Sequence, residues 1–478
     1  MLTFGDVLEA LCGVRPEWAD QVITEASVDS RQVIPGSLFV AMPGERTNGH
    51  AFIQEAFKRG AVMAIIQEDV AEDISVIDLR DPGAAQERLL QKKTPVRIPV
   101  CVRVEHSLTA LQQVARFWRR TLNLKVIGIT GSVGKSTTKE LVAEVLNQRY
   151  NTLKNPGNLN NEIGLPLTLL SVSEGYTRAV LEMGFYVPGE IAMLCELALP
   201  QIGVVTNIGT VHAERAGSIE AIVRGKTELV QALPPAPEGV AVLNYDDPLV
   251  RSMAEKTQAR VFYYGMDPQA DLWADQVESL GLRGVHFQLH YQGETVHMRV
   301  PMIGRHSVHT ALRATAVGLL DGLSWQEIVN GLRASASHLR LVAVRTERGA
   351  LVLDDTYNAS PESTLAALNL LSELDGRKVA VFGDMLELGP YEREGHEMVG
   401  KRAAQVVDQL ICVGSRAQII ADEAVQAGLP ASAILRFADC QQAIEYLVPR
   451  LEERDVVLIK GSHGMRMDRI VSALEAQV

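Results

Sequence analysis

Residues 128–140 read GITGSVGKSTTKE, and this stretch decides what kind of fold the chain must have. A short apolar run precedes it at 124–127, and a segment with helical character follows it to about residue 150. A strand, a glycine-containing loop and a helix in this order are typical of a phosphate-binding loop. The strict pattern G-x-x-x-x-G-K-[ST] wants its first glycine at position 129, where Ile129 stands. The stretch is therefore either a damaged nucleotide site or a phosphate loop of another type.

The polar groups of this loop suit a nucleoside triphosphate. Gly131 and Gly134 let the backbone bend and bring its N–H groups close to phosphate oxygens. Lys135 can reach the β- and γ-phosphates, and the hydroxyl of Ser136 can bind Mg²⁺. The alternative, a glycine turn before a helix, is disfavoured by the intact order of strand, loop and helix. A GTPase is also disfavoured, because no Lys-x-Asp triplet that could read guanine occurs in the chain.

Composition limits the class of protein. A chain of 478 residues suggests about three domains at ~100–200 residues each. A net charge of −12 argues against a nucleic-acid partner or an anionic membrane surface. Five scattered cysteines without a C-x-x-C pair favour a reducing cytoplasm over a disulfide framework or a zinc site. The first residues lack the basic start of a signal peptide, and no apolar run approaches the ~18 residues of a membrane span.

Three segments with different patterns follow one another along the chain. Residues 1–103 hold short strands and turns, and then a polar stretch at 80–97 that we interpret as a surface insertion or a linker. In 104–334 an amphipathic segment precedes alternating strands and helices, which predict a mostly parallel sheet. Residues 285–300 alternate with period two, which predicts antiparallel strands. The alternation of strands and helices resumes in 335–478. We expect an α/β protein of three domains with these boundaries.

Seven stretches in order along the chain resemble motifs of the Mur ligase family, and within it the MurF type. They are TGSVGKSTTKE, NPGNLNNEIGLPLTLL, LEMG, NIGTVHAERAGSIEAI, DDTYNASPES, FGDMLELG and KGSHGMRMD. The stretch at 29–61 fits as well, so the resemblance spans nearly the whole chain. In this family the loop reads T-G-x-x-G-K-[ST], so Gly131 is the expected glycine and Ile129 is no defect.

The resemblance implies an ATP- and Mg²⁺-dependent amide ligase of peptidoglycan precursor synthesis. ATP would convert a carboxylate of UDP-N-acetylmuramoyl-tripeptide into an acyl phosphate, which the amine of D-alanyl-D-alanine then attacks. The N-terminal domain would bind the UDP substrate, the central domain ATP, and the C-terminal, Rossmann-like domain would complete the ligase site. We expect a monomer.

The resemblance also assigns roles to residues of the central domain. ATP would contact the loop residues Thr130, Gly131, Ser132, Val133, Gly134, Lys135 and Ser136. The expected metal ligands are Ser136, Glu182, His212 and Lys226, the last as a carbamate. Together with Lys135, the last three would form the catalytic group. For Lys226 the alternative is a solvated helix lysine, and for His212 it is a capping or packing role.

Five further assignments lie outside the central domain. Ser30 and Arg31 would hold the uridine diphosphate, although a structural salt bridge is an alternative for the arginine. In the C-terminal domain, Arg340 would pack near adenine. Asp355 would face ATP and Asn358 the incoming dipeptide, although such residues often only cap turns.

One stretch departs from the family pattern G-x-H-N-x-x-N. It reads GRHSVHT at 304–310, so Ser307 and Thr310 stand where the family has asparagines. A hydroxyl lacks the paired donor and acceptor of an amide. The departure therefore predicts weakened selection of adenine, while the phosphate chemistry is unaffected.

Two other kinds of ligase and one other class of protein compete with this interpretation. The ligases are the Mur-type enzyme that adds the third peptide residue and a folylpolyglutamate-like enzyme. DDTYNASP and FGDMLELG favour the MurF type over both. The other class is an inactive nucleotide-binding partner protein, which the presence of all four catalytic candidates disfavours.

Overall fold

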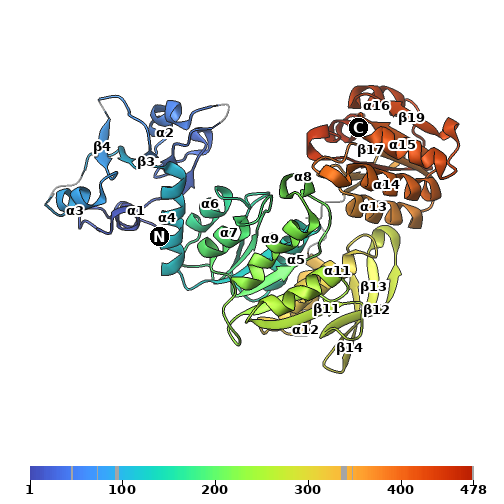
Figure 1. Ribbon diagram of the computed structural model, residues 1–478, viewed down its shortest axis with the longest axis horizontal. Coiled ribbons are helices and arrows are strands. Elements are labelled where there is room, and N and C mark those ends of the chain that lie inside the picture. The colour runs from blue at the N-terminus through green and yellow to red at the C-terminus, as the bar shows by residue number, and fades with distance from the viewer. Residues whose placement is uncertain (45–46, 73, 92–95, 335–341, 347, 476–478) are drawn as a thin grey trace. The chain divides into compact units, whose positions relative to one another are not determined.

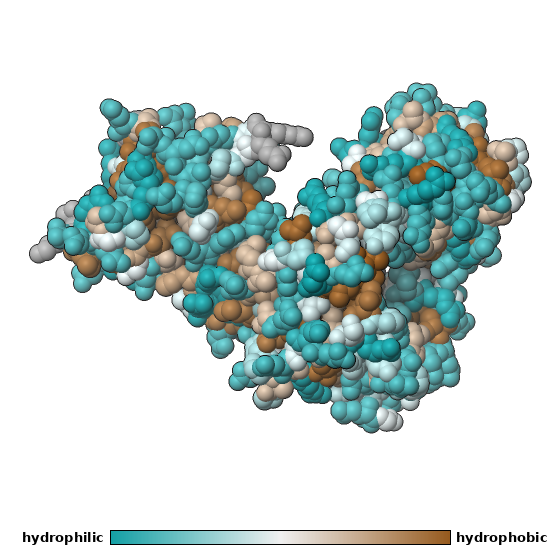
Figure 2. All heavy atoms as spheres, in the orientation of Figure 1, coloured by the Kyte–Doolittle hydropathy of each residue, from teal (hydrophilic) through white to brown (hydrophobic). Residues whose placement is uncertain are grey.

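The computed structural model describes residues 1–44, 47–72, 74–91, 96–334, 342–346 and 348–475. They form three β-sheets with helices around them, which confirms the expected α/β class (Figure 1). The chain divides into two compact units, one of 1–128, 150–184 and 190–201, the other of 129–149, 185–189 and 202–478. No helix in the described ranges is long and apolar enough to cross a membrane. On the face shown in Figure 2, apolar side chains form small groups among hydrophilic ones.

The first sheet consists of five short parallel strands in the order β1-β2-β3-β5-β4. The strands β2 and β3 are apolar and buried along their whole length, as is typical of parallel sheets covered on both faces. The strands are β1 (Ala26–Ser27), β2 (Leu38–Val40), β3 (Met63–Ile66), β4 (Ser75–Asp78) and β5 (Val100–Arg103). The helices are α1 (Phe4–Cys12), η1 (Ser30–Gln32), η2 (Gly49–Phe52), α2 (Ile53–Lys58) and α3 (Pro82–Gln91).

The polar stretch at 80–97, interpreted above as a surface insertion or a linker, is not a linker in its first half. Its residues 82–91 form α3, which packs against α1. Ala85 and Leu89, one turn apart, are buried, and the Gln86 amide donates to the carbonyl of Cys12. Two buried apolar positions in ten residues give too weak a period to reveal a helix in the sequence. Residues 92–95 lie outside the described ranges.

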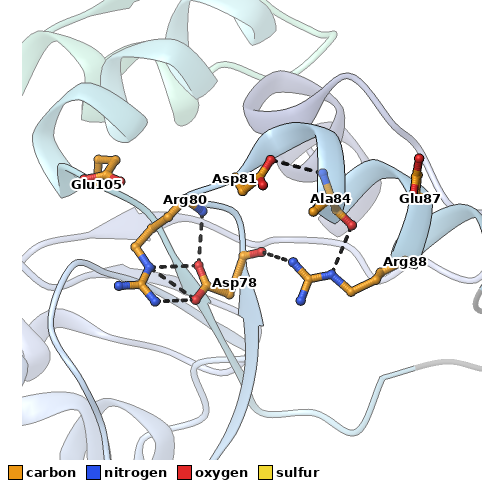
Figure 3. Close-up of a pocket in the computed structure, with 7 residues that line it drawn as sticks. All are labelled: Asp78, Arg80, Asp81, Ala84, Glu87, Arg88 and Glu105. Carbon is orange, nitrogen blue, oxygen red and sulfur yellow. Dashed lines mark hydrogen bonds and ion pairs between the residues drawn. The ribbon is translucent and has the colours of Figure 1, made fainter.

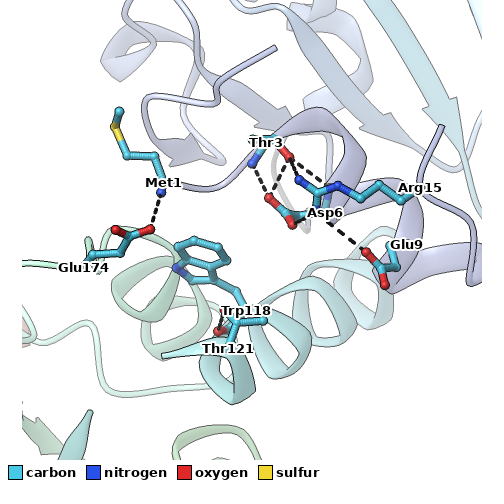
Figure 4. A network of polar contacts seen from close by, with 8 residues as sticks. All are labelled: Met1, Thr3, Asp6, Glu9, Arg15, Trp118, Thr121 and Glu174. Carbon is cyan, nitrogen blue, oxygen red and sulfur yellow. Dashed lines mark hydrogen bonds and ion pairs between the residues drawn. The ribbon is translucent and has the colours of Figure 1, made fainter. Parts of the chain in front are cut away.

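A capping box begins α1 (Figure 4). The Thr3 hydroxyl accepts the N–H of Asp6, and the Asp6 carboxylate accepts the N–H of Thr3 at 2.7 Å and pairs with Arg15. The helix packs against α4 (Ser107–Thr121), whose Trp118 donates its indole N–H to the carbonyl of Val172 at 3.1 Å. The amphipathic segment predicted at this place is therefore a helix that packs through its apolar face.

The second sheet has nine strands in the order β14-β13-β12-β11-β10-β9-β6-β8-β7. β9 to β12 pair in parallel, and β12, β13 and β14 pair antiparallel, which confirms the prediction for 285–300. The strands are β6 (Lys125–Thr130), β7 (Thr152–Lys154), β8 (Arg178–Glu182), β9 (Ile202–Val205), β10 (Val240–Asn244), β11 (Arg260–Gly265), β12 (Leu272–Ser279), β13 (Val285–Tyr291) and β14 (Glu294–Val300). The helices are α5 (Lys135–Leu146), α6 (Gly164–Leu170), α7 (Glu190–Ala198), α8 (Ala213–Ala216), α9 (Ile219–Gln231), α10 (Pro248–Arg251), η3 (Ser252–Lys256), η4 (Gly281–Arg283), α11 (Ser307–Leu320) and α12 (Trp325–Ala334).

The third sheet has six strands in the order β15-β16-β20-β17-β18-β19, all parallel except β15. Along β17, Ala380 and Phe382 face one apolar core and Val379 and Val381 the other, so helices cover both faces. The strands are β15 (Val342–Arg345), β16 (Leu351–Asp355), β17 (Arg377–Gly383), β18 (Gln409–Val413), β19 (Ile434–Phe437) and β20 (Asp455–Lys460). The helices are α13 (Pro361–Glu373), η6 (Gly389–Tyr391), α14 (Glu392–Val406), α15 (Ala417–Gln426), η7 (Ala431–Ala433), α16 (Cys440–Leu447), η8 (His463–Met465) and α17 (Asp468–Glu475).

Candidate active site

The phosphate loop joins β6, which ends at Thr130, to α5. Gly134 caps the helix with φ 82°, a left-handed conformation that favours glycine. Gly131 has φ 142°, and a Cβ there would lie 1.8 Å from the hydroxyl oxygen of Thr206. Both glycines are therefore required by the backbone.

The segment after β9 holds the loop in shape. Asn207 accepts the N–H of Ser132 with its carbonyl at 2.9 Å and the N–H of Val133 with its side chain at 2.8 Å. The Ser132 hydroxyl accepts the N–H of Gly209 at 2.8 Å. These bonds fix the path of the loop between its two glycines, so the loop is shaped before any phosphate binds.

Two lysines donate to the same carbonyl oxygen, that of Gly131. The distance is 2.8 Å from Lys135 Nζ and 3.0 Å from Lys226 Nζ. Lys226 lies on α9 and is fully buried, so the alternative of a solvated helix lysine is wrong. Burial, and after it the charge of Lys135, lowers the pKa of Lys226 well below its ordinary value. The Lys226 amine is therefore disposed to be neutral, and a neutral amine is nucleophilic.

Two predicted Mg²⁺ ligands are buried oxygen donors. Ser136 is the second residue of α5, and Glu182 is the last residue of β8 and only 3% exposed. The Glu182 carboxylate accepts from the Asn160 amide at 2.9 Å, while Asn155 bonds the backbone N–H and carbonyl of the same glutamate. These asparagines come from the NPGNLNN stretch, which thus supports the glutamate.

Among the described residues, acidic, histidine and cysteine side chains do not form a metal site by themselves. Within the described ranges, no group of three or more of them lies close enough together to hold an ion. Mg²⁺ commonly takes only one or two protein oxygens and completes its shell with phosphates and water. The hydroxyl of Ser136 and the carboxylate of Glu182 are each a kind of donor that Mg²⁺ prefers.

His212 precedes α8 with φ 67°, and its imidazole contacts a residue that the sequence did not single out. Its Nδ1 lies 2.7 Å from the carboxylate of Glu387, and the ring of Tyr186 packs edge-on at 4.9 Å. Burial, and after it the charge of Lys135, lowers the pKa of His212 to about 4 despite the glutamate. The imidazole is therefore neutral near pH 7. A proton on Nδ1, donated to Glu387, leaves the Nε2 lone pair available as a ligand.

Glu387 lies in FGDMLELG, a stretch used above only as a family marker. It is 175 residues from His212, so local spacing could not have paired the two. The loop that carries it is held by His396, which is fully buried, accepts the N–H of Met385 at 3.2 Å and contacts the carbonyl of Glu392 at 2.6 Å. The carboxylate is thus presented by a supported loop.

A third lysine joins the two candidates of the DDTYN loop. Lys460, 2% exposed, lies 2.6 Å from the carboxylate of Asp355 and donates to the carbonyl of Asn358 at 2.8 Å. Asp355 and Lys460 are register partners at the ends of β16 and β20. The sequence offers one signal for this pair, because the apolar runs of β16 and β20 each end in a charged residue. Arg340 lies outside the described residues.

The two N-terminal candidates lie in η1. Ser30 is buried, and Arg31 is 79% exposed and forms the salt bridge considered above, with its Nη2 2.7 Å from the carboxylate of Asp29. This pairing lowers the pKa of Asp29. The arginine is therefore paired but open to solvent.

An open pocket between β4 and α3 has no assigned residue in its lining (Figure 3). Its two arginines are already engaged: Arg80 pairs with Asp78 at 2.6 Å, and Arg88 donates to the carbonyl of Ala84 at 3.0 Å. The lining also includes Asp81, Glu87 and Glu105. With Arg80 already paired, these carboxylates make the lining unfavourable for an anionic substrate.

Comparisons with known proteins address the same regions. The model of the Mur ligase middle domain matches residues 129–318, that of the glutamate ligase domain of Mur ligases matches 339–463, and that of the Mur ligase catalytic domain matches 22–119. The chain belongs to the Mur ligase family. The resemblance seen in the motifs is thereby confirmed.

Relatives within the Mur ligase family span almost the full chain. The UDP-N-acetylmuramoyl-tripeptide–D-alanyl-D-alanine ligase of Bacillus subtilis is 32% identical over 96% of this chain and 94% of its own, and that of Escherichia coli is 31% identical over 96% and 95%. The crystal structure of MurF from Acinetobacter baumannii has a TM-score of 0.83 at 28% identity and covers 99% of both chains. MurF from Thermotoga maritima in complex with ADP has a TM-score of 0.77 at 27% identity and covers 96% of this chain and 98% of its own.

Ser307 and Thr310, which replace the two asparagines of the Mur ligase pattern, lie at the start of α11. The Ser307 hydroxyl donates to the carbonyl of Ile303 at 2.7 Å, and the Thr310 hydroxyl accepts from Arg313 at 2.8 Å. Both side chains are buried. Each hydroxyl thus makes a bond within the protein, and neither offers the paired donor and acceptor of an amide.

Proposed function

We propose that this Mur ligase joins D-alanyl-D-alanine to UDP-N-acetylmuramoyl-tripeptide with consumption of ATP, in peptidoglycan precursor synthesis. The observation that carries the proposal is the pair of lysines on the carbonyl of Gly131, one in the phosphate loop and one fully buried. A nucleotide-binding protein needs only the first lysine. Named ligases of this type at 31–35% identity over nearly the whole chain support the substrate assignment.

The chemistry follows from the weakness of a carboxylate as an electrophile. Its oxygen attacks the γ-phosphorus of ATP, the bond to ADP breaks, and an acyl phosphate forms. The dipeptide amine then attacks the acyl carbon, and phosphate leaves with the bonding electrons while the amine loses a proton. Lys135 stabilises charge on the transferred group, which is where most catalysis of phosphoryl transfer arises.

A second reaction prepares the site. The neutral Lys226 amine attacks CO₂, forms a nitrogen–carbon bond and releases a proton, which yields a carbamate anion. When bound, Mg²⁺ would neutralise phosphate charge, and the residues that would hold it are Ser136, Glu182, His212 and the Lys226 carbamate. Burial and the nearby Lys135 both favour the neutral amine that this step requires.

The remaining assignments complete the proposal. Ser30 and Arg31 hold the uridine diphosphate, Asp355 faces ATP, Asn358 faces the dipeptide, and Arg340 packs near adenine. The enzyme acts as a monomer in the cytoplasm, where its nucleotide substrates are available. Its five cysteines are free, as suits a reducing compartment.

Phosphate release tests the proposed reaction. It should require ATP, a UDP-muramoyl tripeptide and D-alanyl-D-alanine together, and tripeptides with lysine or diaminopimelate should be compared. Release that instead requires a UDP-muramoyl dipeptide and a single amino acid would indicate the ligase that adds the third residue. Folate-dependent release would indicate the folylpolyglutamate type.

Glu387→Ala should lower kcat/KM about 10–100-fold, the usual cost of removing a group that orients a metal-binding histidine. Without the carboxylate, the His212 ring loses the bond that sets its tautomer and direction. Steady-state kinetics at saturating Mg²⁺ measures the effect. Glu214→Gln, at an exposed glutamate two residues from His212, is the matched control and should behave as wild type. Equal activity of Glu387→Ala and this control would contradict the orienting role.

Selection of the nucleotide base should be weak, with kcat/KM for ATP no more than about 10–100-fold above that for GTP. Strong rejection of a wrong base needs hydrogen-bonding groups that it leaves unpaired, and the family amides are absent here. The double variant Ser307→Asn/Thr310→Asn restores both amides and should widen the ratio. A ratio in the wild-type enzyme near 10⁴ would show that other groups read adenine.

A further inference from the structure

We propose that Arg313 is a positioning residue of the nucleotide site, a buried cation behind the phosphate loop that strengthens binding of the ATP phosphates. The inference rests on the proposed function, because it concerns the ATP site of that reaction. Arg313 lies on α11 and is 4% exposed. Its Nη2 is so close to the loop that a Cβ on Gly134 would lie 3.3 Å from it.

The guanidinium of Arg313 has no anionic partner in the described part of the chain. Nη2 donates to the Thr310 hydroxyl at 2.8 Å, and Nη1 donates to the Tyr264 hydroxyl at 3.3 Å, so both partners are neutral. Its Nε is buried without a hydrogen-bond partner among the described residues. Removing a guanidinium from water without a counter-charge is costly. Phosphates held by the loop would provide that counter-charge.

A second line of contacts joins Arg313 to the other end of the loop. The Tyr264 hydroxyl, which accepts from Arg313, lies 3.0 Å from the carbonyl of Thr206. The Thr206 hydroxyl donates to the carbonyl of Val133 at 2.7 Å and packs against Gly131. Arg313 therefore supports the loop directly at Gly134 and through Tyr264 and Thr206 at its opposite end. This dual support favours a positioning role over direct recognition of the base.

Other features of the molecule carry less. In the pocket of Figure 3, Arg80 is paired with Asp78 and further carboxylates line the wall. The contact of His212 with Glu387 belongs to the site described above. Arg119 is as buried as Arg313 but donates to the carbonyls of Ala198 at 2.7 Å and Leu124 at 2.8 Å, so it serves helix and strand ends. This difference makes Arg119 the matched control.

Nucleotide affinity measured by calorimetry, with ATP, ADP and adenosine, tests the proposal. Arg313→Gln should lower affinity for ATP and ADP about tenfold or more and leave adenosine unchanged, since the lost charge acts on phosphates. Arg313→Lys should recover most of the loss. Arg119→Gln should lower the melting temperature but retain wild-type affinity for ATP.

Tyr264→Phe keeps the charge and removes the relaying hydroxyl, so it should lower ATP affinity a few-fold and keeps the test open if Arg313→Gln does not fold. Wild-type ATP affinity in the folded Arg313 and Tyr264 variants would overturn this inference and leave the proposed function standing. An equal loss for adenosine would also overturn it and indicate a base contact. A wild-type enzyme that binds no nucleotide would overturn the proposed function as well.

Discussion

Lys135→Ala should abolish measurable ligation, with kcat reduced by at least about 10²–10³-fold, or roughly 3–4 kcal/mol of transition-state stabilisation. Lys135 begins α5, and its ammonium now donates to the carbonyls of Gly131 at 2.8 Å and Ser132 at 3.3 Å. These carbonyls are weak competitors for a cation that a triphosphate would attract. The lost charge acts on the transferred phosphoryl group, so the defect should appear in kcat as well as in KM. Phosphate release with all substrates saturating measures it.

The fold should survive this substitution. Lys135 is only partly buried and contributes charge rather than core packing, so the free energy of unfolding should change by no more than about 1 kcal/mol. Lys256→Ala, at an exposed lysine of η3, is the control for removing a positive charge and should keep full activity. Turnover close to wild type in purified, folded Lys135→Ala would refute the assignment of the phosphate loop.

The parts of the site that the sequence predicted are formed by residues that lie close together in the chain. A strand, two glycines, a lysine and a helix within thirteen residues are enough to place a phosphate loop, and Gly131 and Gly134 have the backbone conformations that the interpretation required. The antiparallel pair at 285–300 was visible for the same reason, because alternation with period two lies within one segment. In both cases the residues that show the sequence pattern are the same residues that form the structural element.

The contacts that sequence reasoning missed join residues far apart in the chain. Glu387 meets His212 across 175 residues, and Lys460 meets Asp355 across 105. Only the pairing of β16 with β20 brings the second pair together, and no periodicity reports which strands become neighbours. Sequence reasoning missed Arg313 for another reason. A lone arginine in a helix is usually solvated, and only the structure shows that this one is buried.

Lys226→Ala should lose at least about 10²-fold in kcat, because it removes the anion that the carbamate would supply. The side chain is fully buried, so the alanine variant also leaves a cavity and should be less stable by about 2–4 kcal/mol. Lys226→Met separates the two effects. It fills the space and avoids burying an amine that is protonated in the unfolded chain at neutral pH. The pKa of Lys226 is lower in the folded protein than in the unfolded chain, so burying the amine costs stability at pH values below the pKa of the unfolded chain. Lys226→Met avoids this cost and should be at least as stable as wild type, yet inactive.

Chemical rescue distinguishes a missing anion from a distorted site. Acetate or propionate at high concentration can enter the space vacated in Lys226→Ala and supply the negative charge that the carbamate would provide. Activity should return in part to Lys226→Ala, but not to Lys226→Met, whose side chain fills the space, nor to Lys135→Ala, whose lost group is a cation. Removing dissolved CO₂ should slow the wild-type enzyme and leave rescued Lys226→Ala unaffected. Full activity of Lys226→Ala without added carboxylate would refute the carbamate role, because the buried lysine would then be only a packing residue.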